Sequence, residues 1–278
     1  MKVLVTGAKG QLGRDVVQEL EKRKYVAIGV GKQEMDITDS IIVRKIIIQE
    51  KIEAIVHCAA YTSVDAAEED ELCREINVNG TRNIAMVCKE LDIPMMYIST
   101  DYVFDGTGAN KWLPRDQRNP INVYGQTKCE GEYFVEDLEK FFIIRTAWVF
   151  GMNGKNFVTT MLKLAEKTAT LSVIDDQIGS PTYTVDLAIL IVDMITTNSY
   201  GIYHATNEGF CSWYEFAKEI FSQSNIDVRV QPVSSEAFSS KAKRPYNSRL
   251  CKEKLLANGF NKLPLWQDAV ARFLSSLQ

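Results

Sequence analysis

The chain begins with a short apolar run that leads directly into three regularly spaced glycines. Lys2–Thr6 reads Lys-Val-Leu-Val-Thr, which is typical of a buried strand, and Gly7, Gly10 and Gly13 follow at intervals of three. A helix is predicted directly after them, over residues 12–22. Glycine lets the backbone approach a ligand closely and a helix N-terminus attracts pyrophosphate, so the segment predicts a dinucleotide-binding turn. Because the spacing is GxxGxxG rather than GxGxxG, an ordinary strand-to-helix turn is the alternative.

Predicted strands and helices then alternate through the first half of the chain. Further strands are expected at Val26–Val30, 53–60, 95–100 and Phe141–Thr146, with helices of ten residues or more among the connections, one of them over residues 72–91. This alternation indicates an α/β fold with a parallel, doubly wound, Rossmann-like sheet. We therefore predict a dinucleotide-binding domain over residues 1–151, to which residues 183–206 return. Residues 152–278 are expected to form mainly a smaller, substrate-binding lid domain.

The end of the second predicted strand bears on the choice of cofactor. An acid at this point normally binds the adenosine ribose of NAD, but this chain has Lys32, which could pair with the 2′-phosphate of NADPH. A surface lysine without a role is the alternative, so NADPH is favoured and NADH stays possible. Asp36 and Ile37 could close over the adenine, although Asp36 could equally be a cap or turn residue. His57, inside the third strand, is expected to be a hydrogen-bonded core residue.

Charge and cysteine usage exclude several classes of protein. The net charge is −4, and Lys and Arg are scattered among acids, which argues against a nucleic-acid partner. The six cysteines form no CxxC pair, so they fit reduced cytoplasmic thiols better than disulfides or a metal site. No signal peptide or membrane span is visible. We expect a cytoplasmic protein without a metal or a membrane partner, and either a monomer or a homodimer.

A tyrosine and a lysine one helical turn apart are the candidate catalytic pair. If a helix begins near Asn122, Tyr124 and Lys128 share one face of it. A cation close to a phenol favours its ionised form and makes it a better proton donor near neutral pH. Thr100 ends a buried strand, where its hydroxyl would lie at the ligand-binding edge of the sheet.

A second pair, Tyr214 and Lys218, has the same spacing. It lies in a segment that begins with a capping box, Ser212 and Glu215, and continues with aromatic residues at helical spacing. We therefore interpret Tyr214 as part of an ordinary packed helix.

Five further segments are distinctive in their order and composition: residues 99–106, 119–128, 145–149, 176–182 and 244–248. Together with the glycine turn, they make the chain resemble the extended short-chain dehydrogenase/reductase superfamily, and within it the dTDP-4-dehydrorhamnose reductase family. The resemblance runs over essentially the whole chain. It implies an NAD(P)H-dependent oxidoreductase that reduces the C4 ketone of dTDP-4-dehydro-L-rhamnose to dTDP-L-rhamnose.

The resemblance also implies roles for individual residues. Tyr124 would donate the proton to the developing alkoxide, Lys128 would hold the nicotinamide ribose and lower the pKa of Tyr124, and Thr100 would hydrogen-bond the sugar oxygen. Cofactor-binding positions would be Gly7, Gly10, Gln11, Leu12, Gly13, Lys32, Asp36, Ile37, Ala59, Ala60, Tyr61, Tyr124 and Lys128. Substrate-binding positions would be Thr100, Asp101, Tyr102, Trp148 and Arg244.

Alternatives stay open for two residues and for the function. Composition alone would place Trp148 in the core, and Arg244 could be a solvated surface charge rather than a clamp on a diphosphate. A sugar-nucleotide epimerase or dehydratase on the same fold would need further acid–base residues near the substrate. A non-catalytic NADP-binding regulatory subunit would have no chemical need for the phenol of Tyr124.

Overall fold

A computed structural model describes residues 1–238 and 240–277, and within that range a six-stranded parallel sheet is the centre of the fold. In sheet order its strands are β10 (Gly201–His204), β5 (Phe141–Thr146), β4 (Met95–Thr100), β3 (Ala54–His57), β1 (Lys2–Thr6) and β2 (Val26–Val30). The chain runs outward from β1 to β2, then returns to β3 on the other side of β1. The predicted α/β, doubly wound class is confirmed. Ligands bind such sheets outside the carboxyl ends of the strands where the direction reverses, here β1 and β3.

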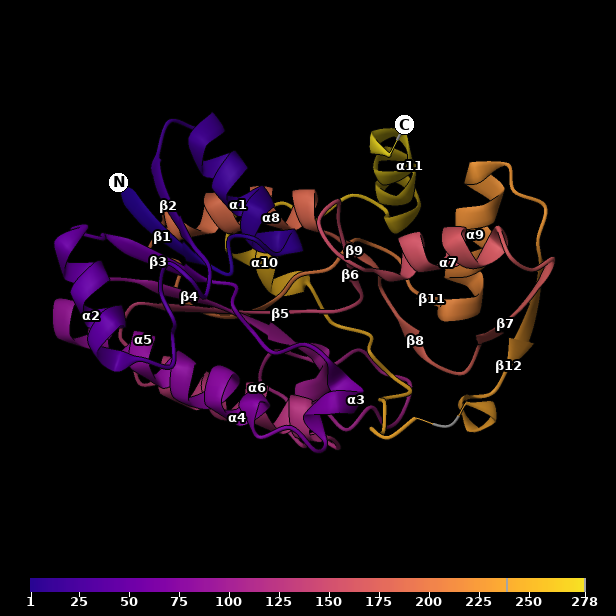
Figure 1. Cartoon of the computed structure of the whole chain (residues 1–278), viewed down its shortest axis with the longest axis horizontal. Helices are drawn as coiled ribbons and strands as arrows, with labels where there is room; N and C mark the ends of the chain where they lie inside the picture. Colours follow the sequence, from indigo (N-terminus) through magenta and orange to yellow (C-terminus); the bar gives the residue numbers. More distant parts are fainter. Residues whose placement is uncertain (239, 278) are drawn as a thin grey trace.

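Helices cover both faces of the sheet (Figure 1). One face carries α1 (Gln11–Lys22) and α8 (Thr184–Ile195); the other carries α2 (Ser40–Gln49), α5 (Thr81–Leu91) and α6 (Val123–Glu136). Side chains of β1 alternate between the two layers: Val3 and Val5 pack with the α1 and α8 side, and Leu4 with the α2 and α5 side. Because both faces are covered, the strand is apolar almost throughout.

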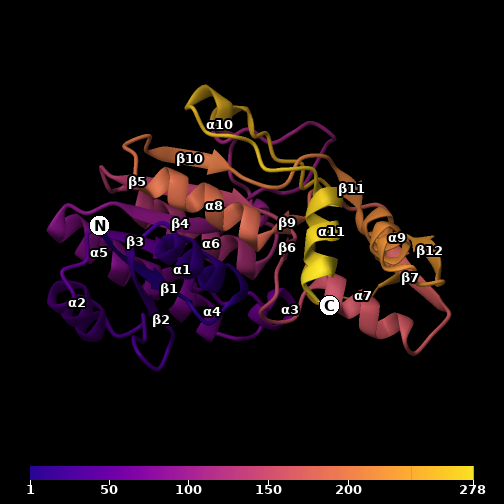
Figure 2. The same cartoon turned by 90° about the horizontal axis from the view of Figure 1, so that it is seen from above.

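A second lobe follows β5 and has a core of its own (Figure 2). Its elements are β6 (Val149–Phe150), α7 (Phe157–Ala165), β7 (Thr170–Ile174), β8 (Ile178–Gly179), β9 (Thr182–Tyr183), β11 (Cys211–Ser212), α9 (Trp213–Ser224), β12 (Arg229–Val233) and α11 (Trp266–Ser276). The rings of Phe150, Phe216 and Phe273 pack together at its centre. This core stabilises the lobe as the second wall of a cleft.

Some C-terminal residues belong to the layers of the main sheet. β10 pairs with β5, and α8 packs on α1. The short helix α10 (Glu253–Ala257) returns as well, since Leu255, Phe260 and Leu263 join the core on the α1 and α8 face. The C-terminal half is therefore divided between the two lobes.

The remaining elements are short, and all of them lie near the edge of the sheet except the 3₁₀ turn Ser235–Ala237, which follows β12 in the second lobe. They are α3 (Val64–Ala67), α4 (Leu72–Arg74), a π-helix (Glu75–Gly80) and two 3₁₀ turns (Asp101–Val103 and Ser235–Ala237). The sequence predicts one continuous helix over residues 72–91, but the π-helix widens it between α4 and α5. Asn77, in this wider turn, accepts from Tyr61 N (2.8 Å) and donates to Tyr61 O (3.1 Å). The interruption thus holds the loop that leaves β3.

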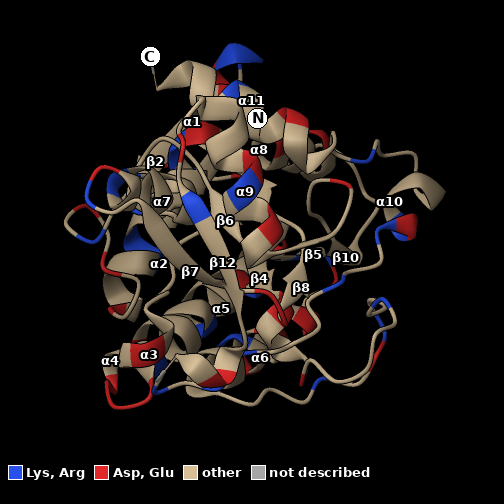
Figure 3. Cartoon of the chain, turned by 90° about the vertical axis from the view of Figure 1, so that its right-hand side faces the viewer, with Lys and Arg blue, Asp and Glu red and all other residues tan. Residues whose placement is uncertain are grey.

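The surface carries charges of both signs. In Figure 3, Lys and Arg are interspersed with Asp and Glu over the second lobe and the helices around it. Among the described residues, no helix combines the length and the apolar composition needed to cross a membrane.

Candidate active site

A cavity of about 770 Å³ opens at the carboxyl edge of the sheet, and the second lobe contributes part of its wall. Most of the predicted site residues line it: Gly7, Gly10, Gln11, Leu12, Gly13, Lys32, Asp36, Ile37, Ala59, Ala60, Thr100, Asp101, Tyr102, Tyr124, Lys128 and Trp148. Two predicted residues, Tyr61 and Arg244, are not part of this lining. The sheet edge therefore brings segments that are far apart in sequence to one cleft.

The glycine turn between β1 and α1 is closely packed. Gly7 has φ +65°, and a Cβ there would lie 2.8 Å from Ala59 N. A Cβ on Gly13 would lie 2.2 Å from Gly7 O, so neither position has room for a side chain. In the described structure no side chain caps the N-terminus of α1, where Gly10 is the N-cap. The first N–H groups of α1 thus lie at the cavity wall, and such groups bind anionic oxygens.

The end of β2 places a cation and a carboxylate at the cavity. Lys32 Nζ lies 4.0 Å from Asp36 Oδ2, and the Lys32 side chain is 73% exposed. Asp36 Oδ1 accepts from Thr38 N (3.0 Å) and Thr38 Oγ1 (2.8 Å), and these hydrogen bonds hold the Asp36 pKa below its usual value. Asp36 therefore fills the turn role that the sequence left open, while it also lines the cavity.

The loop after β3 is fixed by hydrogen bonds. His57 is fully buried, with Nδ1 2.7 Å from Thr6 Oγ1 and Nε2 3.1 Å from Thr81 Oγ1, and burial lowers its pKa to about 3. A neutral imidazole held in this way is structural, as its place within a strand predicts. Tyr61 Oη donates to Asp70 Oδ2 (2.8 Å), so the loop between α3 and α4 holds the Tyr61 side chain.

Helix α6 carries the candidate catalytic pair. Asn122 caps it, accepting from Gly125 N at 2.7 Å. A Cβ on Gly125 would lie 2.2 Å from Tyr102 O, so this glycine lets the first turn of α6 pack against the end of β4. The Tyr124 ring meets the Tyr102 ring edge to face, with centroids 5.7 Å apart. Tyr124 and Lys128, one turn apart, both face the cavity.

Burial shifts the pKa values of the pair in opposite directions. It raises the pKa of Tyr124, against the effect of the Thr100 hydroxyl, and it lowers the pKa of Lys128 to about 7. The Lys128 Nζ lies over the Tyr97 ring, 3.9 Å from its centroid. In the protein alone, burial has the largest effect on Tyr124 and its pKa is raised, so the expected lowering of this pKa by Lys128 stays a prediction. The phenol keeps its proton at neutral pH.

A buried carboxyl lies beside this pair. Burial raises the pKa of Asp101 to about 6. Its oxygens accept from Ser248 Oγ and from Thr100 Oγ1, the latter at 3.1 Å. Ser248 comes from the C-terminal segment, so this contact joins the end of β4 to the second half of the chain.

Two stacked indoles form the wall opposite the sheet. Trp148 and Trp213 lie with centroids 3.6 Å apart at 14°, and both line the cavity. Trp148 has φ +51°, which is strained for a bulky residue, and Gly179 leaves room beneath it, since a Cβ there would lie 2.8 Å from Trp148 Cε2. Gln177 Oε1 accepts from Trp213 Nε1 at 3.2 Å. Trp148 therefore lies on the cavity wall, and its role in substrate binding stays a prediction.

Sequence reasoning missed Trp213 and Lys155, which also line the cavity. Trp213 is the first residue of α9, next to the capping box, and its aromatic neighbours at helical spacing predict a packed face rather than a site. No local pattern distinguishes its outward ring from that face. The interpretation of Tyr214 agrees with the structure: it lies in α9 behind the capping box, outside the cavity lining.

Arg244 lies beside the site rather than in it. Its guanidinium forms a bidentate pair with Asp65, from Nη1 to Oδ1 at 3.1 Å and from Nη2 to Oδ2 at 2.6 Å. The backbone carbonyl of its neighbour Lys243 accepts a hydrogen bond from Asn122 Nδ2 at 2.7 Å. The segment around Arg244 thus crosses from the C-terminal half to α3 and the start of α6.

The fold and the cleft together define a class. A doubly wound sheet with a glycine turn after β1, a hydroxyl at the end of β4 and a Tyr–Lys pair on the following helix is the arrangement of the extended short-chain dehydrogenases/reductases. The chain belongs to the RmlD substrate binding domain family, whose model matches residues 1–278.

Individual relatives match over the whole chain. A dTDP-4-dehydrorhamnose reductase from Clostridium acetobutylicum has a solved structure with TM-score 0.97 and 40% identity, covering 100% of both chains. A dTDP-4-dehydrorhamnose reductase from Bacillus anthracis, solved in complex with NADP, has TM-score 0.96 and 42% identity, covering 99% of both chains. The spore coat polysaccharide biosynthesis protein SpsK of Bacillus subtilis is 39% identical, covering 98% of this chain and 96% of the relative.

Proposed function

We propose that the protein reduces the C4 ketone of dTDP-4-dehydro-L-rhamnose to dTDP-L-rhamnose, with NADPH as the reductant. The relatives named dTDP-4-dehydrorhamnose reductase, one of them in complex with NADP, support this substrate and this cofactor. The observation that carries the proposal is that Tyr124, Lys128 and the β1–α1 glycine turn line one cavity. A proton donor and a dinucleotide-binding turn in the same cleft are what reduction of a ketone requires.

The residues around the glycine turn fit a dinucleotide. Gly7 and Gly13 leave no room for side chains, which keeps the backbone accessible, and the uncapped start of α1 offers N–H groups to a pyrophosphate. Lys32 supplies a cation for a 2′-phosphate. The segments that follow β2 and β3 surround the adenosine and nicotinamide ends of the dinucleotide, through Asp36, Ile37, Ala59, Ala60 and Tyr61. NADPH bound here supplies the hydride.

The residues of β4 and α6 act on the substrate. Tyr124 holds its proton at neutral pH because burial raises its pKa, and it gives that proton to the ketone oxygen as negative charge develops there. Thr100 orients the same oxygen, and Lys128 holds the nicotinamide ribose. Asp101 and Tyr102 position the sugar from the same side as Thr100, and the Trp148 ring positions it from the opposite wall.

The two lobes divide the work. Residues 1–151, with the return over 183–206, bind the dinucleotide, and the remaining C-terminal residues mainly supply the substrate wall. Arg244 binds the diphosphate of the sugar nucleotide and exchanges its partner Asp65 for phosphate oxygens, which suit a planar guanidinium. All six cysteines are free thiols, which supports a reducing, cytoplasmic location.

Two alternatives have less support. An epimerase or dehydratase needs a further acid or base at the substrate, and Asp101, the buried carboxyl nearest in sequence to Thr100, is engaged by Ser248 and Thr100. A binding-only regulatory subunit gives no reason for a phenol and an ammonium to share the cavity with the glycine turn.

The direct test is turnover. The protein is incubated with NADPH and dTDP-4-dehydro-L-rhamnose, and the loss of nicotinamide absorbance is followed, with NADH in a parallel reaction. We expect NADPH oxidation that depends on the sugar nucleotide, and a lower kcat/KM with NADH. No oxidation with either nucleotide would overturn the proposal.

A further inference from the structure

A third charged residue lies on the same face of α6 as the catalytic pair. Tyr124, Lys128 and Glu132 follow one another at intervals of one helical turn. Glu132 is fully buried, with 0% of its side chain exposed, and it lies behind the cavity rather than on its wall. A buried carboxylate is costly unless several donors satisfy it, so its position one turn from Lys128 requires an explanation.

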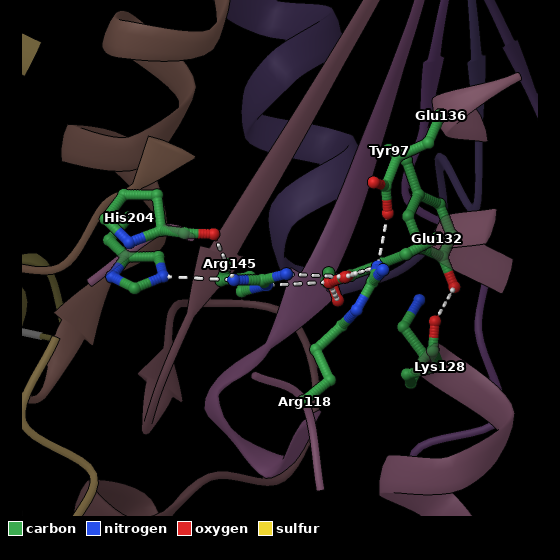
Figure 4. Close-up of polar contacts among 9 residues, drawn as sticks. Tyr97, Arg118, Lys128, Glu132, Glu136, Arg145 and His204 are labelled. Carbon is green, nitrogen blue, oxygen red and sulfur yellow. Dashed lines mark hydrogen bonds and ion pairs between the residues drawn. The ribbon is translucent and has the colours of Figure 1, made fainter. Parts of the chain in front are cut away.

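Four hydrogen bonds hold the Glu132 carboxylate (Figure 4). Oε1 accepts from Ser99 Oγ at 2.5 Å and from Arg145 Nε at 2.9 Å. Oε2 accepts from Arg145 Nη2 at 2.7 Å and from Arg118 Nη1 at 2.9 Å. Burial alone would raise the pKa of Glu132, but these donors, Arg145 foremost, hold it below its usual value. The carboxylate is therefore ionised and fixed in place.

Its partners are the neighbours of site residues. Ser99 directly precedes Thr100 in β4. Arg145 lies opposite Ser99 in β5 and precedes the segment that carries Trp148. One carboxylate thus ties α6, with Tyr124 and Lys128, to the two strand ends that carry the other site residues. A shift of Glu132 would change the separation between Thr100 and Tyr124.

The charge of Glu132 also acts on Lys128. The groups that face Lys128 come from several elements: His57 and Cys58 of β3 and its exit, Cys73 of α4, Tyr97 of β4, and Glu132 of its own helix. Among them Glu132 is the ionised carboxylate. Burial lowers the pKa of Lys128 and Glu132 opposes that effect more than the two thiols do.

We propose that Glu132 is a positioning residue for the reduction: it locks the Tyr124–Lys128 face of α6 against the ends of β4 and β5, and holds its carboxylate one helical turn from the Lys128 ammonium. The inference rests on the proposed function for its turnover readout, but its binding readout does not need the sugar substrate.

The first test measures cofactor binding as a function of pH. NADPH is titrated by fluorescence between pH 5.5 and 9 with the parent protein, Glu132→Gln and Glu136→Gln. Glu136 is the matched control, because it lies on the same helix and pairs with the same Arg118 but contacts neither Ser99 nor Arg145. We expect NADPH affinity to fall as the pH rises and Lys128 loses its proton, and the midpoint pH of this fall to be lower by about one unit in Glu132→Gln. One unit is the size of an ordinary perturbation by one charge. The control should keep the parental midpoint, and equal midpoints in all three proteins would overturn the charge role.

The second test is steady-state turnover at pH 7. Glu132→Gln should lower kcat by about 10- to 100-fold with a smaller change in KM, because misplacement affects the reacting groups more than binding. Parental kcat in this variant would overturn the positioning role. If the parent protein does not turn over the sugar nucleotide, the proposed function fails, and the pH titration still decides the role of Glu132.

Removal of one partner from a buried ion pair can unfold a protein, so a second variant is needed. The double variant Glu132→Leu/Arg145→Met replaces the pair by apolar side chains and is expected to recover thermal stability without recovering kcat or the parental midpoint. Recovery of kcat and of the parental midpoint would show that the Glu132–Arg145 pair is merely structural and would overturn the proposal. Ser99→Ala, which exposes no charge, should lower kcat and leave the midpoint unchanged.

Discussion

At the scale of single residues, the reaction depends on the phenol of Tyr124. Tyr124→Phe removes the proton donor and little volume, so we expect kcat to fall by about 10²–10⁴-fold while NADPH binds as in the parent. The check combines steady-state kinetics with fluorescence titration of NADPH. Tyr214→Phe is the control. The Tyr214 ring lies in α9 with its centroid 5.3 Å from Lys218 Nζ, so this substitution should affect stability alone. Loss of turnover in the control and not in Tyr124→Phe would reverse the assignment.

Lys128 gives a pH signature in stability. Its pKa is about 7 in the folded protein and 10.5 in the unfolded chain, so between these values the unfolded state binds the extra proton. Stability therefore rises with pH through this window, and below pH 7 the buried ammonium costs on the order of a few kcal/mol. Lys128→Met should be more stable than the parent at pH 6.5, with an advantage that shrinks by pH 8.5. Urea unfolding at pH 6.5 and at pH 8.5 measures the difference in the free energy of unfolding, with Lys218→Met as control. A constant difference would show that Lys128 is not desolvated.

At the scale of elements, the β1–α1 turn has two glycines with different tolerances. A Cβ on Gly13 would lie 2.2 Å from Gly7 O, whereas one on Gly10 would lie 3.2 Å from it. Gly13→Ala should therefore cost roughly 1–3 kcal/mol of stability and weaken NADPH binding, and Gly10→Ala should cost less stability. Thermal unfolding and NADPH titration test both. Equal stability and equal NADPH affinity of the two variants would mean that the turn adjusts freely.

Local signals predicted the elements well. The apolar run before Gly7 and the cap at Asn122 are local in sequence, and β1 and α6 begin where these signals place them. The break in the helix over residues 72–91 was not predictable, because Asn77 widens it to reach Tyr61, a partner with no periodic signal.

At the scale of the whole molecule, the site depends on contacts between distant segments. Ser248 reaches Asp101 and Trp213 stacks on Trp148 across long stretches of chain. No local pattern encodes such pairs, so Trp148 was indicated by the family resemblance alone and Trp213 was missed. A glutamate such as Glu132 is likewise typical of an exposed helix position. Only its hydrogen bonds to Ser99 of β4 and Arg145 of β5 explain why it is buried.

The pair between Arg244 and Asp65 gives a prediction at this scale. Arg244→Lys keeps the charge but loses the bidentate geometry, so KM for the sugar nucleotide and the inhibition constant of dTDP should each rise about 10-fold, which corresponds to about 1.4 kcal/mol. NADPH affinity should not change. Lys241→Ala, which removes an exposed pair with Glu69, is the control. If Arg244→Lys and Arg244→Ala both keep the parental constants, the diphosphate binds elsewhere, and Arg249 is the next residue to test.

The central claim is that the cleft transfers hydride from NADPH to C4 of a dTDP-linked 4-keto sugar while Tyr124 protonates the oxygen. The most direct measurement uses NADPH that carries deuterium at nicotinamide C4 on the transferred face, with the product examined by NMR and mass spectrometry. The account predicts one deuterium per product molecule, at sugar C4, in the parent protein and a strongly reduced rate of its formation in Tyr124→Phe. Deuterium at another carbon, or product formed without deuterium from either face, would contradict it.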